Sequence, residues 1–382
     1  MCCFKKILLT SIVVLGCFTG YGQMDRTARY SYADWSGETE GNLSFRFEGL
    51  SFFQNDEYND DFIEGYTLIG YSVQPSVLYN LTPKLRLKAG VHLLQYHGVS
   101  DFSELIPVYS AHLKLFKNLD LIMGALKGDV QHRMIEPVFN PENQYTRPVE
   151  QGIQFLFKGK NVWVDTWLDW DQFIFSDDTI PERFTYGLST EFDLLKTTSG
   201  FKLSLPFQFI ARHTGGQIGH YSERQKTLTN SVFGLRLARD FKGGIVKGID
   251  LDVYSLFYND ISDDIVYYYS NGNALYYTLK VDYGHGELML GYWDADKFMA
   301  PKGSALFHSL TSLDYIFYRK SRQMFNTKFS YQKKIAKYAD LSLMFESYYD
   351  LNISKMEYSY GVHLLVTPSY FIRNFKPSGS QK

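Results

Sequence analysis

The segment FKLSLPFQF, residues 201–209, alternates apolar and polar side chains without a break, and LYYTLKVDY, residues 275–283, repeats the rhythm. Because successive side chains of a β-strand point to opposite faces, each segment predicts a strand with one apolar and one polar face. Bursts of about ten residues with this alternation recur from Leu43 to Val366, a length typical of strands that cross a membrane. The pattern therefore predicts an all-β protein.

The first 22 residues have the features of a cleaved secretory signal. Two lysines precede an apolar stretch, residues 7–20, that is too short to span a bilayer, and small residues stand before Gln23. The alternative is a lipoprotein-type cleavage box at 14–17, which would place a lipid on Cys17. All three cysteines of the chain lie within this segment, so cleavage after Gly22 would leave a mature chain without thiols.

The composition favours a membrane β-barrel. The chain contains 30 Tyr and 30 Phe, yet the mature part has no apolar run near the ~20 residues of a transmembrane helix. Strands that are apolar on one face, with aromatic girdles, give this combination. A net charge of −2 argues against a nucleic-acid partner. A soluble secreted β-sandwich or propeller is the alternative, disfavoured by the many apolar faces and the absence of a blade repeat.

Short and long connections alternate along the chain, as they do in outer-membrane barrels. The short connections are 80–84, 117–118, 158–161, 195–200, 242–248, 284–286 and 333–340, and the longer ones are 53–64, 97–105, 128–149, 172–182, 213–226, 259–272, 294–321 and 350–355. They predict an antiparallel transmembrane barrel of about sixteen strands, with fourteen to eighteen acceptable because 303–320 could hide another pair. The expected organisation is a signal peptide (1–22), a short periplasmic leader (23–40), the barrel (41–367) and a C-terminal tail (368–382).

A family resemblance supports this fold. The last expected strand alternates up to Val366, and the chain carries the segments EGYTLIGY (64–71), HRMIEP (132–137), WVDTWLDW (163–170) and HTGGQIGH (213–220). With these features it resembles Bacteroidota-type outer-membrane β-barrel proteins of the porin-like kind. The resemblance implies a barrel in the outer membrane of a Gram-negative bacterium, and it supplies no substrate.

The polar phase of the strands is expected to face the lumen. Its ten basic and twelve acidic residues nearly balance, so strong ion selectivity is not indicated. Either a water-filled pore with opposing charges or a lumen closed by its own ion pairs fits this balance. The residues expected to line the pore or contact a solute are Arg86, Lys88, Arg133, Arg147, Glu150, Trp163, Asp165, Trp167, Asp169, Arg212 and Arg236.

Two segments stand out within this set. In 163–171, tryptophans and aspartates share the lumen face, which suits either a sugar site or an aromatic girdle whose acids pair with neighbouring cations. The loop 130–150 is long enough to be functional. It is interpreted either as a constriction loop, with Arg133 and Arg147 facing Glu136 and Glu150, or as a cap held by its own ion pairs.

Other polar groups carry weaker signals. The pair of histidines in 213–220 and the aspartates at 260, 263 and 264 lack the spacing of a metal or calcium site. His112, His308 and His363 lie near serines without a nucleophile motif. No metal, cofactor or enzymatic activity is therefore predicted, and a membrane hydrolase remains the minor alternative.

Two functions compete. The first is porin-like passage or binding of small solutes, with 128–150 narrowing the mouth. The second is a plugged barrel that serves as a structural subunit of an outer-membrane assembly, such as export or protein-insertion machinery. The expected partners are outer-membrane lipid, small solutes, and either protein partners or further copies of the chain.

Overall fold

The computed structural model describes residues 24, 26, 29, 30, 32, 35, 39–60, 63–216, 218, 225–263, 268–311 and 318–375. The predicted signal segment, including Cys17, lies outside this set. Most of the described chain forms one closed antiparallel sheet. Its strands are β1 (Asn42–Glu57), β4 (Thr67–Thr82), β5 (Leu85–Tyr96), β6 (Glu104–Phe116), β7 (Leu119–Ala125), β8 (Gln151–Lys158), β9 (Val162–Gln172), β10 (Glu182–Lys196), β11 (Phe201–Gly215), β12 (Lys226–Asp240), β13 (Gly248–Asp260), β14 (Asn271–Asp282), β15 (Gly286–Asp296), β16 (Ser321–Ala336), β17 (Ala339–Asp350), β18 (Lys355–Val366) and β19 (Ser369–Asn374).

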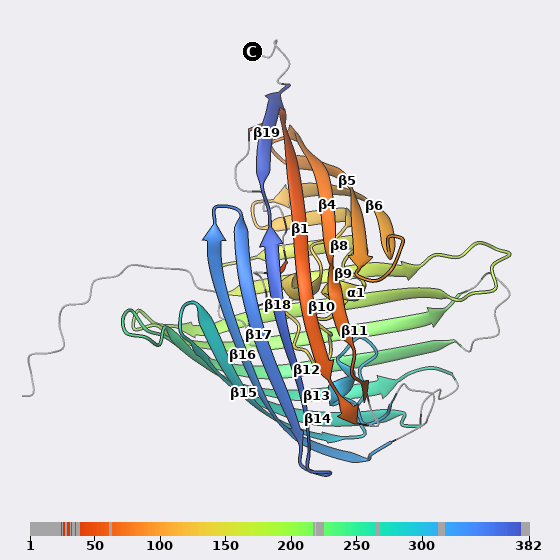
Figure 1. The fold of residues 1–382 in the computed structure, drawn as a ribbon, viewed down its shortest axis with the longest axis vertical. Helices are drawn as coiled ribbons and strands as arrows, with labels where there is room; N and C mark the ends of the chain where they lie inside the picture. Colours follow the sequence, from red (N-terminus) through yellow and green to blue (C-terminus); the bar gives the residue numbers. More distant parts are fainter. Residues whose placement is uncertain are drawn as a thin grey trace, which may run out of the picture.

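The barrel closes at β1, which pairs with β4 on one side and with β18 and β19 on the other (Figure 1). Gly49 pairs with Val366 and Arg46 with Ser369, so the register continues unchanged from β18 into β19. The two are one long strand interrupted at Pro368, which has no N–H to donate to the ladder. The barrel therefore has sixteen strands, as predicted, and the segment expected to be a tail supplies the last part of the sixteenth.

The connections lie where the alternation of short and long segments predicts them. For example, β6 and β7 are joined by two residues, whereas 126–150 connects β7 to β8. The long connection after β1 contains a two-stranded hairpin, formed by β2 (Asn59–Asp60) and β3 (Ile63–Glu64). In the described part of 303–320 the structure has the 3-10 turn Ala305–Phe307 and one isolated bridge, so the barrel gains no further strand pair there.

The two faces of the strands differ as expected for a membrane barrel. On β14, the outward residues Leu275, Tyr277 and Leu279 are exposed, whereas Thr278 and Lys280 are buried towards the lumen. An apolar outer face and a polar inner face are the membrane-barrel arrangement. Among the described residues, no helix is long and apolar enough to cross a membrane.

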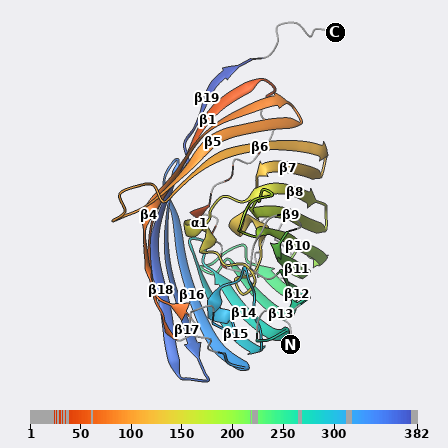
Figure 2. The same ribbon diagram turned by 90° about the vertical axis from the view of Figure 1, so that its right-hand side faces the viewer.

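The lumen is occupied by the protein's own chain, which we call the plug. It consists of 126–150, of 297–311 and of the described residues between Met24 and Trp35; Figure 2 shows the helix α1 (Asn143–Thr146) inside the barrel. Plug residues such as Val138 and Phe307 are fully buried in one apolar cluster with wall residues such as Tyr254 and Trp293. Residues expected to form a periplasmic leader thus lie within the barrel.

If the outward face contacts lipid, the cost of placing a charge on it should depend on the depth of the residue in the membrane. Tyr277 lies near the middle of β14 and Tyr283 beside the following short turn, and the two side chains are 39% and 38% exposed. On a lipid face, Tyr277→Arg should cost about 2–4 kcal/mol of unfolding free energy and Tyr283→Arg only about 0–1 kcal/mol, because the penalty for a charge falls towards the interface. Denaturant unfolding in lipid bilayers, followed by tryptophan fluorescence, measures both. Equal costs at the two positions would contradict a lipid-facing surface.

Candidate functional site

A buried histidine joins the plug to the barrel wall. His132 lies in the 3-10 turn Asp129–His132, with Nδ1 2.8 Å from Asp165 Oδ2 on β9 and Nε2 3.0 Å from Glu150 Oε2. Its ring stacks on Trp167 at a centroid distance of 3.5 Å. Burial alone would lower the pKa of His132, but the carboxylates of Glu150 and Asp165 outweigh it and raise the pKa to about 10. The side chain is therefore an imidazolium held between two carboxylates.

The backbone around His132 is strained. Asp129 and Arg133, which begin and follow the turn, have φ values of 53° and 57°, in the left-handed region that side chains other than glycine rarely adopt. The Asp129 carboxylate is buried, and neither of its oxygens has a hydrogen-bond partner in the part of the chain that the structure describes. Burial, with the nearby charge of Glu150, raises the pKa of Asp129 to about 8. Strain of this kind persists only where surrounding contacts impose it, and the ionic bonds of His132 are such contacts.

A second ionic cluster joins three separate parts of the chain. Lys328 on β16 contacts Glu136 of the plug, and its Nζ lies 3.2 Å from Glu346 Oε2 on β17. Arg26, from the N-terminal part of the plug, pairs with Glu346 and lies 3.6 Å from Glu136. The Tyr348 hydroxyl donates to Glu346 at 2.6 Å. Two cations and two carboxylates thus compensate one another in a buried place where an isolated charge would be costly.

A third set of contacts fixes the remaining part of the plug. Arg147 pairs with Asp171 on β9, and Lys302 lies 3.4 Å from the same carboxylate. Arg212 on β11 donates to the Pro301 carbonyl at 3.1 Å. Both long plug segments, 126–150 and 297–311, are therefore attached to the wall through charged side chains.

The tryptophan–aspartate segment faces the lumen at Asp165, Trp167 and Asp169, all of which are buried. The ring of Trp167 is only 2% exposed because His132 covers it, and the Arg133 guanidinium lies 4.2 Å from the centroid of Trp163. In this conformation, protein side chains occupy the ring faces that a sugar would need. The contacts match those of an aromatic segment whose acids are paired with plug cations.

The other predicted lumen residues also have partners. Arg236 contacts Asp252 at 2.7 Å and Glu191 at 2.6 Å, and Lys88 lies 3.6 Å from Glu48. The Arg86 guanidinium lies 5.6 Å from the ring centroid of Trp35.

Within 130–150, the recorded ion pairs of Glu136, Arg147 and Glu150 differ from those expected. Glu136 and Arg147 pair with other parts of the chain, and Glu150 pairs with His132. One ionic pair therefore lies within the loop, and the others join it to β9, β16 and the N-terminal part of the plug.

The sequence did not predict that N-terminal residues contribute charged side chains to the lumen. Arg26 and Arg29 are buried in the lumen, where Arg29 donates to the Tyr145 hydroxyl at 3.1 Å. These residues lie in a polar stretch without strand periodicity, so alternation could not locate them. The one available signal was the small excess of acids over bases in the predicted lumen.

A histidine–threonine pair lies on the outer face. His213 Nδ1, near the end of β11, is 2.8 Å from Thr227 Oγ1 on β12, at the end of the barrel that carries the long connections. Phe184 lies against the His213 ring at 5.0 Å and stacks on Trp170. An imidazole beside a hydroxyl is the first requirement of nucleophilic catalysis, and an orienting third group is the next. No carboxylate is recorded against His213 in the described part of the chain.

The histidines of 213–220 and the aspartates 260, 263 and 264, which the sequence offered as metal ligands, are not brought together in the described part of the chain. His220 and Asp264 lie outside the described residues, and Asp260 caps its own turn by accepting from the Ser262 N–H at 3.0 Å. Within the ranges that the structure describes, no group of three or more His, Cys, Asp or Glu side chains is placed to hold a metal ion.

Comparison with solved structures finds similar barrels at low identity. OprD from Pseudomonas aeruginosa matches with a TM-score of 0.49 and 9% identity, covering 88% of this chain and 95% of that chain. OmpT of Vibrio cholerae matches with 0.49 and 10%, covering 88% and 99%. OccAB3 of Acinetobacter baumannii matches with 0.48 and 9%, covering 86% and 99%. At such identities these likenesses carry no information about solutes or chemistry.

No curated protein matches the sequence. A family model described as lipid A 3'-O-deacylase-type matches residues 35–375, which include every strand of the barrel. This β-barrel chain therefore belongs to the lipid A 3'-O-deacylase-type family.

Proposed function

We propose that the protein binds small polar solutes and passes them across the outer membrane, and that the plug closes the barrel in the conformation described. The observation that carries this proposal is the ionic attachment of the plug to the wall. Sixteen strands enclose a lumen wide enough for an aqueous channel. Permanent filling would be served at least as well by apolar packing, since buried ion pairs often contribute less than well-packed hydrophobic residues.

The wall behind the plug suits water and solutes. With the plug withdrawn, the lumen would expose Asp165, Asp171 and Lys328, together with paired groups such as Arg236 and Asp252. Charges of both signs line such a channel, which favours small polar solutes without strong preference for one ion sign. Withdrawal requires the loss of these ionic contacts, of hydrogen bonds such as that from Asn230 to the Met299 carbonyl, and of the apolar packing around residues such as Phe139 and Phe307.

The pKa values of plug residues predict how the closure of the barrel depends on pH. His132 has a folded pKa of about 10 against an ordinary 6.5, so its stabilisation is complete below 6.5 and is lost as pH rises towards 10. Burial raises the pKa of Asp129 to about 8 and that of Glu142 to about 7, so both gain a buried charge over the same range. Glu150 remains ionised because His132 outweighs its burial and lowers its pKa. Alkaline pH should therefore release the plug.

This proposal predicts a pH-dependent conductance. In planar bilayers, the purified barrel should be almost silent near pH 6 and conduct increasingly as the pH is raised to about 9.5, because His132 loses its proton. His132→Gln should conduct already near pH 7. Hydrogen bonds to charged groups contribute about 1.5–3 kcal/mol, so the open-state probability should rise roughly ten-fold or more.

The matched control is His285→Gln, in the exposed short turn between β14 and β15. It should conduct like the parent protein at every pH. Replacement of 129–148 and of 298–310 by short glycine–serine links, together with deletion of 24–35, removes all three parts of the plug and tests whether the barrel itself can conduct. If this deletion variant inserts into the bilayer but stays silent, solute passage is refuted and a structural role in an outer-membrane assembly is favoured.

A second candidate function is hydrolysis of an acyl ester on an outer-leaflet lipid, the reaction class that the family description names. The observation that favours it is the outward pair of His213 and Thr227, set among aromatic side chains at the end with the long connections. His213 could accept the proton as Thr227 Oγ1 attacks the ester carbonyl, and could return it to the lipid hydroxyl that leaves as the ester C–O bond breaks. Water would then hydrolyse the acyl-threonine ester and release a fatty acid. A filled lumen is no obstacle to a reaction on the outer face.

The corresponding prediction concerns lipid A treated with the reconstituted protein. If this candidate is right, mass spectrometry should detect loss of one ester-linked acyl chain. Thr227→Val and His213→Gln should reduce the rate by at least about 10²-fold, the usual contribution of a general base. Thr166→Val, at an outward-facing threonine on β9, is the control and should retain full activity. Unchanged lipid A with the parent protein, or an active Thr227→Val variant, would exclude this candidate.

A further inference from the structure

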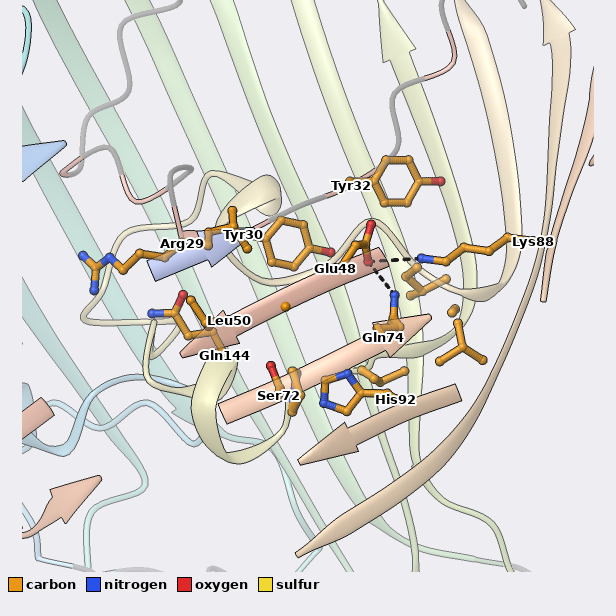
Figure 3. A pocket seen from close by; sticks show the side chains of 17 residues that line it. Arg29, Tyr30, Tyr32, Glu48, Leu50, Ser72, Gln74, Lys88, His92 and Gln144 are labelled. Atoms are coloured by element: carbon orange, nitrogen blue, oxygen red, sulfur yellow. Dashed lines mark hydrogen bonds and ion pairs between the residues drawn. The ribbon is translucent and has the colours of Figure 1, made fainter. Parts of the chain in front are cut away.

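A cavity of about 90 Å³ lies between the plug and the barrel wall. The wall side is formed by residues of β1, β4 and β5, including Glu48, Ser72 and His92, and the plug side by residues that include Tyr30 and Gln144 (Figure 3). One water molecule needs about 10–15 Å³ of such a cavity, so this volume accommodates roughly six to nine waters. The space therefore suits a solute with the bulk of a short polyol.

Two buried side chains that line the cavity have hydrogen-bonding atoms without partners among the described residues. Within that set, Gln144 is 3% exposed and neither its Oε1 nor its Nε2 has a partner, while His92 is 5% exposed and its Nε2 has none. Native proteins rarely leave buried polar atoms unsatisfied, because each costs about 1–3 kcal/mol. The amide offers a donor and an acceptor, and the imidazole nitrogen can serve as either, which together match the hydroxyl group.

Glu48 and Lys88 compensate one another at the cavity. The guanidinium of Arg29, the third charged side chain of the lining, points away from this pair (Figure 3) and donates to the Tyr145 hydroxyl at 3.1 Å. Lys88 Nζ lies 3.6 Å from Glu48 Oε2, and the same oxygen accepts from Gln74 Nε2 at 2.7 Å. Figure 3 shows Lys88 and Gln74 converging on Glu48 at one side of the space. A charged ligand would lose its hydration without finding an uncompensated partner, which is expensive in a buried site. The cavity therefore favours a neutral ligand.

The remaining lining is apolar and aromatic. Leu50, Leu126 and Leu365 line the cavity together with Tyr30, whose hydroxyl oxygen accepts from the Gly128 N–H at 3.1 Å. Carbon–hydrogen groups pack well on such surfaces while hydroxyl groups reach the polar atoms opposite. A molecule with an alternating pattern of C–H and O–H groups satisfies both sides.

We infer that this cavity is a binding site for a small neutral polyol of about the size of glycerol. The inference deepens the proposed solute function, because it names the chemical class that the closed barrel retains between plug and wall. Binding nevertheless depends only on the closed conformation, so it can be measured independently of conductance.

The test is ligand-observed saturation-transfer NMR on the full-length protein purified in detergent without glycerol. Glycerol and erythritol are the neutral probes, with acetate and methylammonium as charged probes of comparable or smaller size. The parent protein should transfer saturation to the neutral probes and, relative to them, at least five-fold less to the charged ones. Gln144→Leu should weaken glycerol binding at least five-fold, since it removes both unpartnered amide atoms while keeping the size of the side chain.

Two further variants complete the experiment. Gln95→Leu, on the outward phase of β5 and outside the cavity, should bind like the parent protein. Ala125→Leu fills the cavity from β7 and should abolish binding even if Gln144→Leu fails to fold. No transfer to either polyol would mean that the cavity holds water only and would overturn the inference, as would undiminished binding by Ala125→Leu. Polyol binding by a barrel that never conducts would sustain the site and refute passage.

Discussion

The imidazolium of His132 between Asp165 and Glu150 is the interaction on which the closed barrel depends most. The His132 side chain is completely buried, where an unpaired charge would cost much free energy. Its two contacts connect the wall strand β9 to both ends of the loop 126–150. The strained turn at Asp129 and Arg133 stays in place because this contact fixes it. Without the charge on His132, two buried carboxylates would face a neutral ring, and the strain would favour release of the loop.

The barrel could be predicted from the sequence because a two-residue period is local. Alternation in 201–209 and 275–283 reports the two faces of a strand, and loop composition reports where the chain turns. Register then follows, because a slip of one residue would put every apolar side chain on the wrong face. Even the position of each long connection agrees with the structure, since strand length is fixed by the thickness of the membrane.

The contents of the lumen could not be predicted in the same way. The partners of Glu136 are Lys328 and Arg26, which lie far from it along the chain and share no periodic pattern with it. Charge balance alone is compatible with both an open and a closed lumen. The aromatic residues on the lumen-facing side of the strands did indicate that the lumen is filled by protein. Tyr254, Tyr276 and Trp293 face the lumen, where large aromatic side chains indicate packing against a protein surface better than contact with water.

Arg26 enters the lumen from the end of the barrel where β1 begins beside the short turn after β4, whereas Glu136 arrives on a long connection from the opposite end. The two meet at Glu346 and Lys328, so the charge balance at this point depends on segments anchored on both sides of the membrane. Removal of Arg26 from this point would leave the carboxylates of Glu136 and Glu346 sharing the single ammonium group of Lys328. The N-terminal segment and the long loop are thereby coupled through one shared charge balance, although they reach it from opposite ends of the barrel.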